Sequence, residues 1–115
     1  MATATLHVPD VGGFIGPARC WRLDPPREID GRRHEYVTVV IQPRLGQQSC
    51  EVKTYPSGET GACADRQMNR RVGSFVLDTT PTTPEAVDGA HWLALQLLGG
   101  YEVAAGVGDA GEEVS

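Results

Sequence analysis

The chain has 115 residues, a net charge of −5 and a hydrophobic content of 40%. A chain of this length and composition is typical of one globular domain with its own core, which argues against wholesale disorder. No apolar stretch approaches the roughly 20 residues of a membrane-spanning helix, and no secretory leader pattern opens the chain. We therefore expect a soluble, cytoplasmic domain that does not enter a membrane.

The charges are distributed unevenly along the chain. All ten Lys and Arg residues lie from Arg19 to Arg71, whereas residues 72–115 hold seven carboxylates and no Lys or Arg. Such asymmetry concerns partners more than fold. We predict that residues 104–115 form an acidic, disordered tail that can pair with arginine-bearing loops of the same or a neighbouring chain. Nine of the ten bases are arginine, which is typical of GC-rich coding sequences such as those of actinobacteria and their phages.

Residues 1–17 are predicted to form a flexible N-terminal arm. Residues 5–8 can form a short strand there, and the Pro-Asp-Val-Gly-Gly run that follows would end it. The glycine-rich residues 12–16 lack the entering strand and the following helix of a phosphate-binding loop. We therefore assign no ligand to the arm.

Four strands are expected after the arm, at residues 19–23, 35–42, 50–55 and 72–78. Residues 35–42 are apolar on both faces, as in a central strand, and residues 50–55 alternate like a half-buried one. The Asp30-Gly31 pair indicates a turn within a predicted loop over residues 24–33. Residues 56–71 form a loop of a length that is often functional or disordered.

A helix is predicted over residues 84–98. Thr83 is a suitable N-cap, Pro84 suits the first helical position, and Gly99-Gly100 would end the helix. Residues 101–103 can add a short final strand. Strands followed by a helix predict an α+β domain over residues 18–103, with an antiparallel sheet of three to five strands and one C-terminal helix (about 84–98) packed on one face.

Spacing at 100° per residue divides this predicted helix into two faces. The apolar, core-facing stripe comprises Ala86, Val87, Ala90, Leu93, Ala94, Leu97 and Leu98, with His91 at one edge and Leu95 at the other margin. The opposite face is polar except for Trp92, which contradicts the binary pattern. One interpretation is that the arm or the long loop covers Trp92, or that the helix is slightly rotated.

The other interpretation is a protein interface. Trp92 lies one turn from Gly89, where the missing side chain lets another backbone approach. On this hypothesis Trp92, Gly89, Leu95 and Asp88 form the contact surface of a symmetric homodimer.

The nucleophilic and metal-ligating residues show no local motif. They are three cysteines and three histidines: Cys20, Cys50, Cys63, His7, His34 and His91. No two of them have the short spacing of a structural zinc site, so we expect no metal and no cofactor. Cys63, in the loop over residues 56–71 near Arg66, leaves a thiol enzyme open as an alternative. The pattern does not favour an enzyme, and it assigns no catalytic residue.

Two groups of arginines are candidate contacts for an anion or a partner. They are Arg32 and Arg33, which follow Arg27, and the group Arg66, Arg70 and Arg71. Guanidinium groups bind phosphates, but a pI near 5.0 and the lack of a nucleic-acid-binding motif disfavour DNA or RNA as the partner.

We predict a small, non-enzymatic protein-binding or regulatory domain whose partner is another protein or a second copy of itself. Two alternatives remain open. The first is a structural or assembly component of a phage particle, which would place the protein in the virion and order its ends on assembly. The second is a nucleic-acid-binding regulator.

Overall fold

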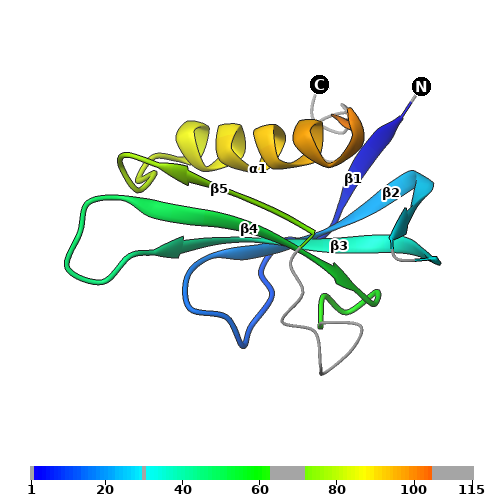
Figure 1. The fold of residues 1–115 in the computed structure, drawn as a ribbon, viewed down its shortest axis with the longest axis horizontal. Coiled ribbons are helices and arrows are strands. Elements are labelled where there is room, and N and C mark those ends of the chain that lie inside the picture. The colour runs from blue at the N-terminus through cyan, green and yellow to red at the C-terminus, as the bar shows by residue number, and fades with distance from the viewer. Residues whose placement is uncertain (1, 30, 63–71, 105–115) are drawn as a thin grey trace, which may run out of the picture.

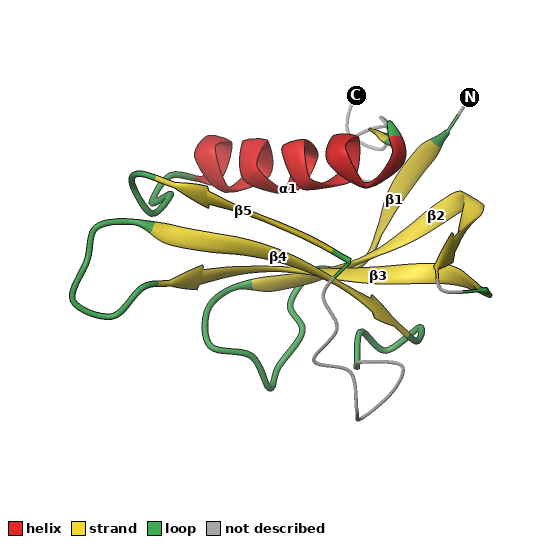
Figure 2. Ribbon diagram, in the orientation of Figure 1, coloured by secondary structure: helices red, strands yellow, loops and turns green. Residues whose placement is uncertain are grey.

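The computed structural model of the chain describes residues 2–29, 31–62 and 72–104. These residues form an α+β fold in which one helix lies on one face of a curled sheet (Figures 1 and 2). The elements are β1 (Thr3–Val8), β2 (Ala18–Ile29), β3 (Arg32–Pro43), β4 (Cys50–Ser57), β5 (Gly73–Leu77), α1 (Pro84–Gly99) and β6 (Glu102–Val103).

The sheet has six strands in the order β5-β4-β3-β2-β1-β6. The first five strands in the chain form an antiparallel meander, whereas β6 pairs parallel to β1. The parallel pair arises because α1 carries the chain back across the sheet, from β5 at one edge to β1 near the other. The predicted α+β class and C-terminal helix are confirmed. The predicted antiparallel sheet of three to five strands was too small, and it missed the parallel strand.

The N-terminus is part of this sheet. Residues of β1 pair with β2, and Ala4 is fully buried in the core. The following loop returns to the sheet, where the Val11 amide donates to the Ala18 carbonyl at 2.9 Å. The segment predicted as an arm over residues 1–17 therefore contains a paired strand, as the sequence of residues 5–8 allowed, and Val11 is hydrogen-bonded to the sheet. Of the predicted acidic tail, residues 105–115 lie outside the described residues.

The hairpin of β2 and β3 is longer than predicted. The expected loop over residues 24–33 is largely strand, because β2 continues through Pro25-Pro26 to Ile29. The register is irregular between Arg22 and Arg27, around two residues that have no backbone N–H to donate. The Tyr101 hydroxyl donates to the Pro25 carbonyl at 2.6 Å, so this end of the hairpin lies beside the end of α1. Gly31, at the predicted turn, has φ of 78°.

Both ends of α1 form as the sequence indicates. The Ala86 amide donates to the Thr83 hydroxyl at 3.2 Å, which satisfies one of the free N–H groups of the first turn. Gly100 takes the left-handed conformation with φ of 72°, and its amide donates to the Gln96 carbonyl at 2.7 Å.

Each face of the sheet carries its own apolar cluster. The larger cluster lies under α1 and takes Val37, Val39 and Ile41 from β3. The smaller includes Val11 and Val40 and lies on the opposite face, where the loop after β1 runs (Figure 1). β3 is therefore buried on both faces, as its apolar sequence predicts.

Candidate functional site

The helix presents a different face to the sheet from the one predicted. Its buried residues are Ala90, His91, Ala94, Leu95 and Leu98. Leu93 and Leu97, predicted to face the core, are 42% and 66% exposed. The alternative of a rotated helix is the one that the structure shows. The rotation places Leu93 and Leu97 at the surface.

The four predicted interface residues do not share one surface. Trp92 is 53% exposed and Gly89 is also exposed, so both remain available to a partner. Asp88 is exposed as well, but its carboxylate accepts a hydrogen bond from Arg19 at 2.8 Å. Leu95 is fully buried, so its assignment to an interface is wrong.

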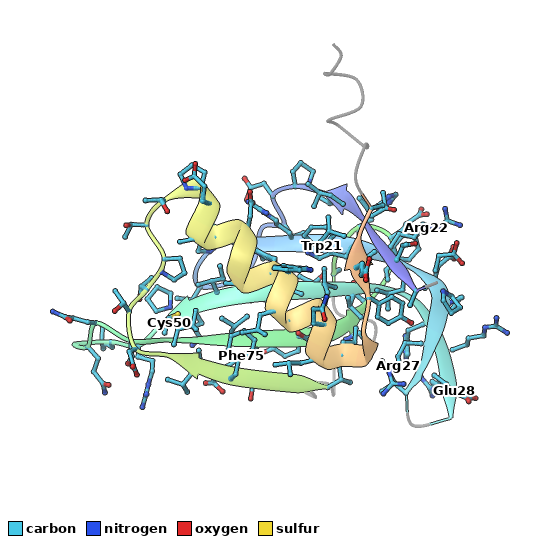
Figure 3. All side chains as sticks on the ribbon, turned by 90° about the horizontal axis from the view of Figure 1, so that it is seen from above. Trp21, Arg22, Arg27, Glu28, Cys50 and Phe75 are labelled. Atoms are coloured by element: carbon cyan, nitrogen blue, oxygen red, sulfur yellow. The ribbon has the colours of Figure 1, made fainter. Side chains whose placement is uncertain are left out.

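The rotation of α1 brings His91 against Trp21 of β2, which lies beneath the helix (Figure 3). The Trp21 indole N–H donates to His91 Nδ1 at 3.4 Å, and the ring centroids are 5.9 Å apart. Burial and, secondarily, the positive charge of Arg19 lower the pKa of His91 to about 3, against a smaller opposing effect of Asp88. The imidazole is therefore neutral at physiological pH.

Neutral His91 is poorly suited to acid–base catalysis. Because Nδ1 accepts the indole proton, the imidazole proton resides on Nε2, which has no hydrogen-bond partner among the described residues. An unsatisfied buried donor of this kind costs about 1–3 kcal/mol. The side chain has no solvent-accessible surface, so a substrate has no route to this proton. The pair is a feature of the core.

The two described cysteines are also buried. Cys20 Sγ lies 3.8 Å from the Ser57 hydroxyl, and the Thr38 hydroxyl donates toward the Gly61 carbonyl at 2.8 Å beside them. Desolvation raises the pKa of the Cys20 thiol, which disfavours the nucleophilic thiolate. Cys50 is likewise fully buried, whereas Cys63 lies outside the described residues. Within the described ranges, no three His, Cys, Asp or Glu side chains are grouped to hold a metal ion.

The outer edge of β5 is one of the two edges of the described sheet. In the described part of the chain, β5 pairs with β4 alone and ends the sheet on that side. Its sequence, Gly-Ser-Phe-Val-Leu, has no charge and no proline. The opposite edge belongs to β6, which has only two residues. Edge strands of soluble proteins usually carry charges or are very short, and β5 has no charge.

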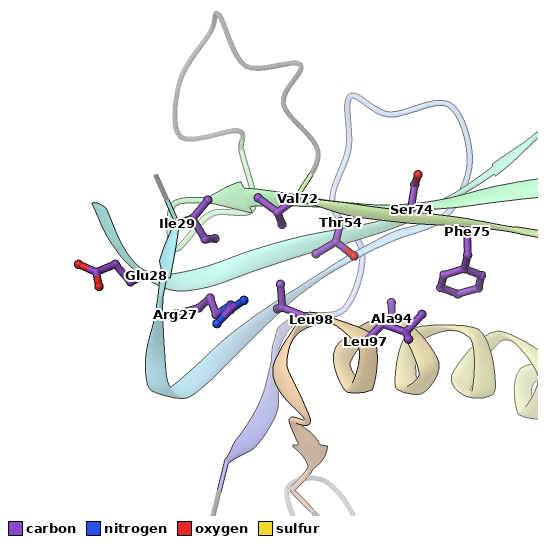
Figure 4. A pocket seen from close by; sticks show the side chains of 11 residues that line it. Arg27, Glu28, Ile29, Thr54, Val72, Ser74, Phe75, Ala94, Leu97 and Leu98 are labelled. Atoms are coloured by element: carbon purple, nitrogen blue, oxygen red, sulfur yellow. The ribbon is translucent and has the colours of Figure 1, made fainter. Parts of the chain in front are cut away.

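A cavity of about 530 Å³ lies between the C-terminal half of α1 and the sheet (Figure 4). Phe75 projects from β5 toward the helix, and Arg27 reaches in from the far end of β2, while the neighbouring Glu28 points away. The lining residues are Arg27, Glu28, Ile29, Thr54, Val72, Gly73, Ser74, Phe75, Ala94, Leu97 and Leu98.

The predicted arginine contacts are only partly described. Arg32 and Arg33 are exposed on β3, next to the hairpin turn. The second group, Arg66, Arg70 and Arg71, lies outside the described residues. Sequence reasoning grouped Arg27 with the first cluster but did not predict a cavity, because it ended β2 near Leu23.

Comparison of the chain with protein-family models, curated proteins and solved structures found no match. Among the described residues, no helix combines the length and the apolar character needed to cross a bilayer.

Proposed function

We propose that the protein is a non-enzymatic protein-binding domain that forms a homodimer through the edge of β5 and the adjoining side of α1. The observation that supports this most directly is the uncharged, five-residue edge strand β5. Unpaired N–H and C=O groups on such an edge are a template for another strand. A second copy supplies an identical strand in antiparallel orientation, which meets the requirement of two-fold symmetry.

The leucines of α1 extend this surface. Leu93 and Leu97 are four residues apart, so they lie one above the other on the same side of the helix. Leu97 lines the same cavity as Phe75, which places this side of α1 toward β5. In an antiparallel pair of β5 strands, the two helices lie on the same face of the joined sheet, where these leucines can cover one another. We define the β5 edge, Leu93 and Leu97 as the β5 surface.

Trp92 belongs to the other side of the helix. Asp88, four residues before it, faces Arg19 of β2, whereas Leu93 and Leu97 lie on the β5 side. The sequence-based proposal of an interface centred on Trp92 and the present proposal therefore concern different surfaces. They can be tested against each other.

Light scattering measures the mass of each form directly. We expect the wild-type protein to have twice the monomer mass of 12.3 kDa. Leu97→Glu, which places a charge on the β5 surface, and Val76→Lys, which charges the edge strand, should each give a monomer. Trp92→Ala should remain a dimer. Ile15→Glu is the matched control, because Ile15 is 74% exposed in the loop on the opposite face of the sheet.

Two results would overturn the proposal. A wild-type protein that stays monomeric up to millimolar concentration excludes self-association. Dissociation by Trp92→Ala, with Leu97→Glu still dimeric, assigns the interface to the other side of α1.

A further inference from the structure

We propose that the cavity beside the end of α1 binds a small carboxylate with an apolar body, such as a medium-chain alkyl acid or an aryl acid. The inference does not rest on self-association, because it concerns a cavity within one chain. Its volume of about 530 Å³ falls in the range of small-molecule sites.

The residues that line the cavity are of two kinds, apolar and charged or polar. Six of the eleven lining residues are apolar, among them Phe75 on β5 and Ala94 and Leu98 on α1. Arg27 supplies the only positive charge among the lining residues. The single acidic lining residue, Glu28, points away from the centre (Figure 4). One cation beside a group of apolar side chains matches a carboxylate attached to a hydrocarbon or a ring.

In the described part of the structure, the Arg27 guanidinium is available to bind a carboxylate. Alternation along the strand directs it toward the cavity and its neighbour Glu28 to the other face. No ion pair or hydrogen bond of its guanidinium occurs within the described ranges. Its stem lies near the end of the helix, where a Cβ added to Gly99 would stand 3.8 Å from Arg27 Cδ. The guanidinium can donate two hydrogen bonds to a bound carboxylate, one to each oxygen.

Thr54 adds a polar group to the floor of the cavity. It lies on β4 opposite Gly73, and only 3% of its surface is exposed. Its side chain lies between Val72 and Leu98 in Figure 4. The other hydroxyl among the lining residues, Ser74, points away from the helix in Figure 4. So few polar groups suit an amphipathic ligand better than a sugar or a nucleotide, which need many polar partners.

The test measures binding of defined probes by amide chemical shifts and by titration calorimetry. The probes are acetate, hexanoate, octanoate and 1-octanol. Because each buried methylene contributes about 0.8 kcal/mol, affinity should rise about fourfold per methylene between hexanoate and octanoate. Octanoate should bind at least about tenfold more tightly than octanol, the gain expected of a charge-assisted hydrogen bond. The shifts should centre on Phe75, Ala94 and Leu98.

Arg27→Gln should abolish the preference for octanoate over octanol, and Arg27→Lys should retain part of it. The matched control is Arg33→Gln. Arg33 pairs with Glu28 across the hairpin, so it shares the face that points away from the cavity. Thermal unfolding confirms that each variant is folded; should Arg27→Gln fail to fold, Arg27→Lys and the octanol comparison decide.

Equal binding of acetate and octanoate, equal binding of octanoate and octanol, or shifts elsewhere in the protein would each overturn the proposal. An Arg27→Gln protein that keeps the carboxylate preference would do the same. The dimer proposal is judged separately, because Arg27 lies outside the β5 surface. Arg27→Gln should leave the mass in light scattering unchanged whether or not the chain dimerises.

Discussion

Acid should destabilise this fold at a pH well above that at which carboxylates titrate, because His91 is buried as a neutral base. Its pKa falls from an ordinary 6.5 to about 3 in the folded protein. The unfolded chain therefore takes up the proton first as the pH decreases. The contribution of His91 to stability is complete above pH 6.5 and is lost progressively between pH 6.5 and pH 3.

The magnitude follows from these two pKa values. Between about pH 6 and pH 4 the unfolded state holds nearly one more proton than the folded state, which gives a slope of about 1.4 kcal/mol per pH unit. From about pH 7.5 to pH 5 the loss from His91 amounts to about 2 kcal/mol. With the side chain fully buried and Nε2 without a hydrogen-bond partner in the described residues, protonation would add a poorly solvated charge.

Urea unfolding followed by tryptophan fluorescence measures this loss in the wild-type protein and in His91→Asn. The variant has no titrating group at this position, so its free energy of unfolding should decline by about 2 kcal/mol less over the same pH range. His34→Asn keeps His91 and is the control, with a loss equal to that of the wild type. Equal pH dependence in the wild type and in His91→Asn would refute the assignment of the proton uptake to His91.

Two further substitutions test the local structure. Thr83→Ala removes the side chain that accepts the Ala86 amide, and we expect the free energy of unfolding to fall by about 1 kcal/mol, measured by urea denaturation. Gly16→Ala should cost at least about 1–3 kcal/mol in the same assay, because Gly16 has φ of 108° and a Cβ there would overlap the Ile41 carbonyl oxygen. Gly12→Ala is its control, since nothing lies within 4 Å of a Cβ at that position. Equal stability of the two glycine variants would contradict the close approach of Gly16 to β3.

The helix and most of the strands were predictable because their signals are local. Thr83, Pro84 and Gly100 mark the ends of α1 through groups within a few residues of each other. β3 was recognised as central because its apolar residues fall on both faces. Nothing outside these segments was needed to find them.

The strands at the margins were harder to predict because their signals are weak or distant. β1 has one fully buried residue, the small Ala4, and β6 has only two residues. β6 joins the sheet only by pairing with β1, through Thr3 and Glu102. This parallel pair forms only because α1 carries the chain back across the sheet. A single sequence carries little information about such a contact.

The orientation of α1 shows a similar limit. An amphipathic pattern ranks Leu93 and Leu97 above His91 as core residues. In the fold, Trp21 on the sheet supplies an N–H that a histidine can accept and a leucine cannot. The choice of helix face thus depends on a residue 70 positions away in the chain.

The same orientation accounts for the cavity and for the position of the β5 surface. With His91 and Leu95 turned inward, the small Ala94 faces the sheet where Phe75 approaches from β5. A methyl group at that position leaves space that a leucine would fill, and Leu97 is directed to the rim. Arg27 reaches this space because β2 continues past its two prolines to the end of the helix. The long hairpin and the rotated helix, both missed by local patterns, therefore create the binding surfaces proposed for this protein.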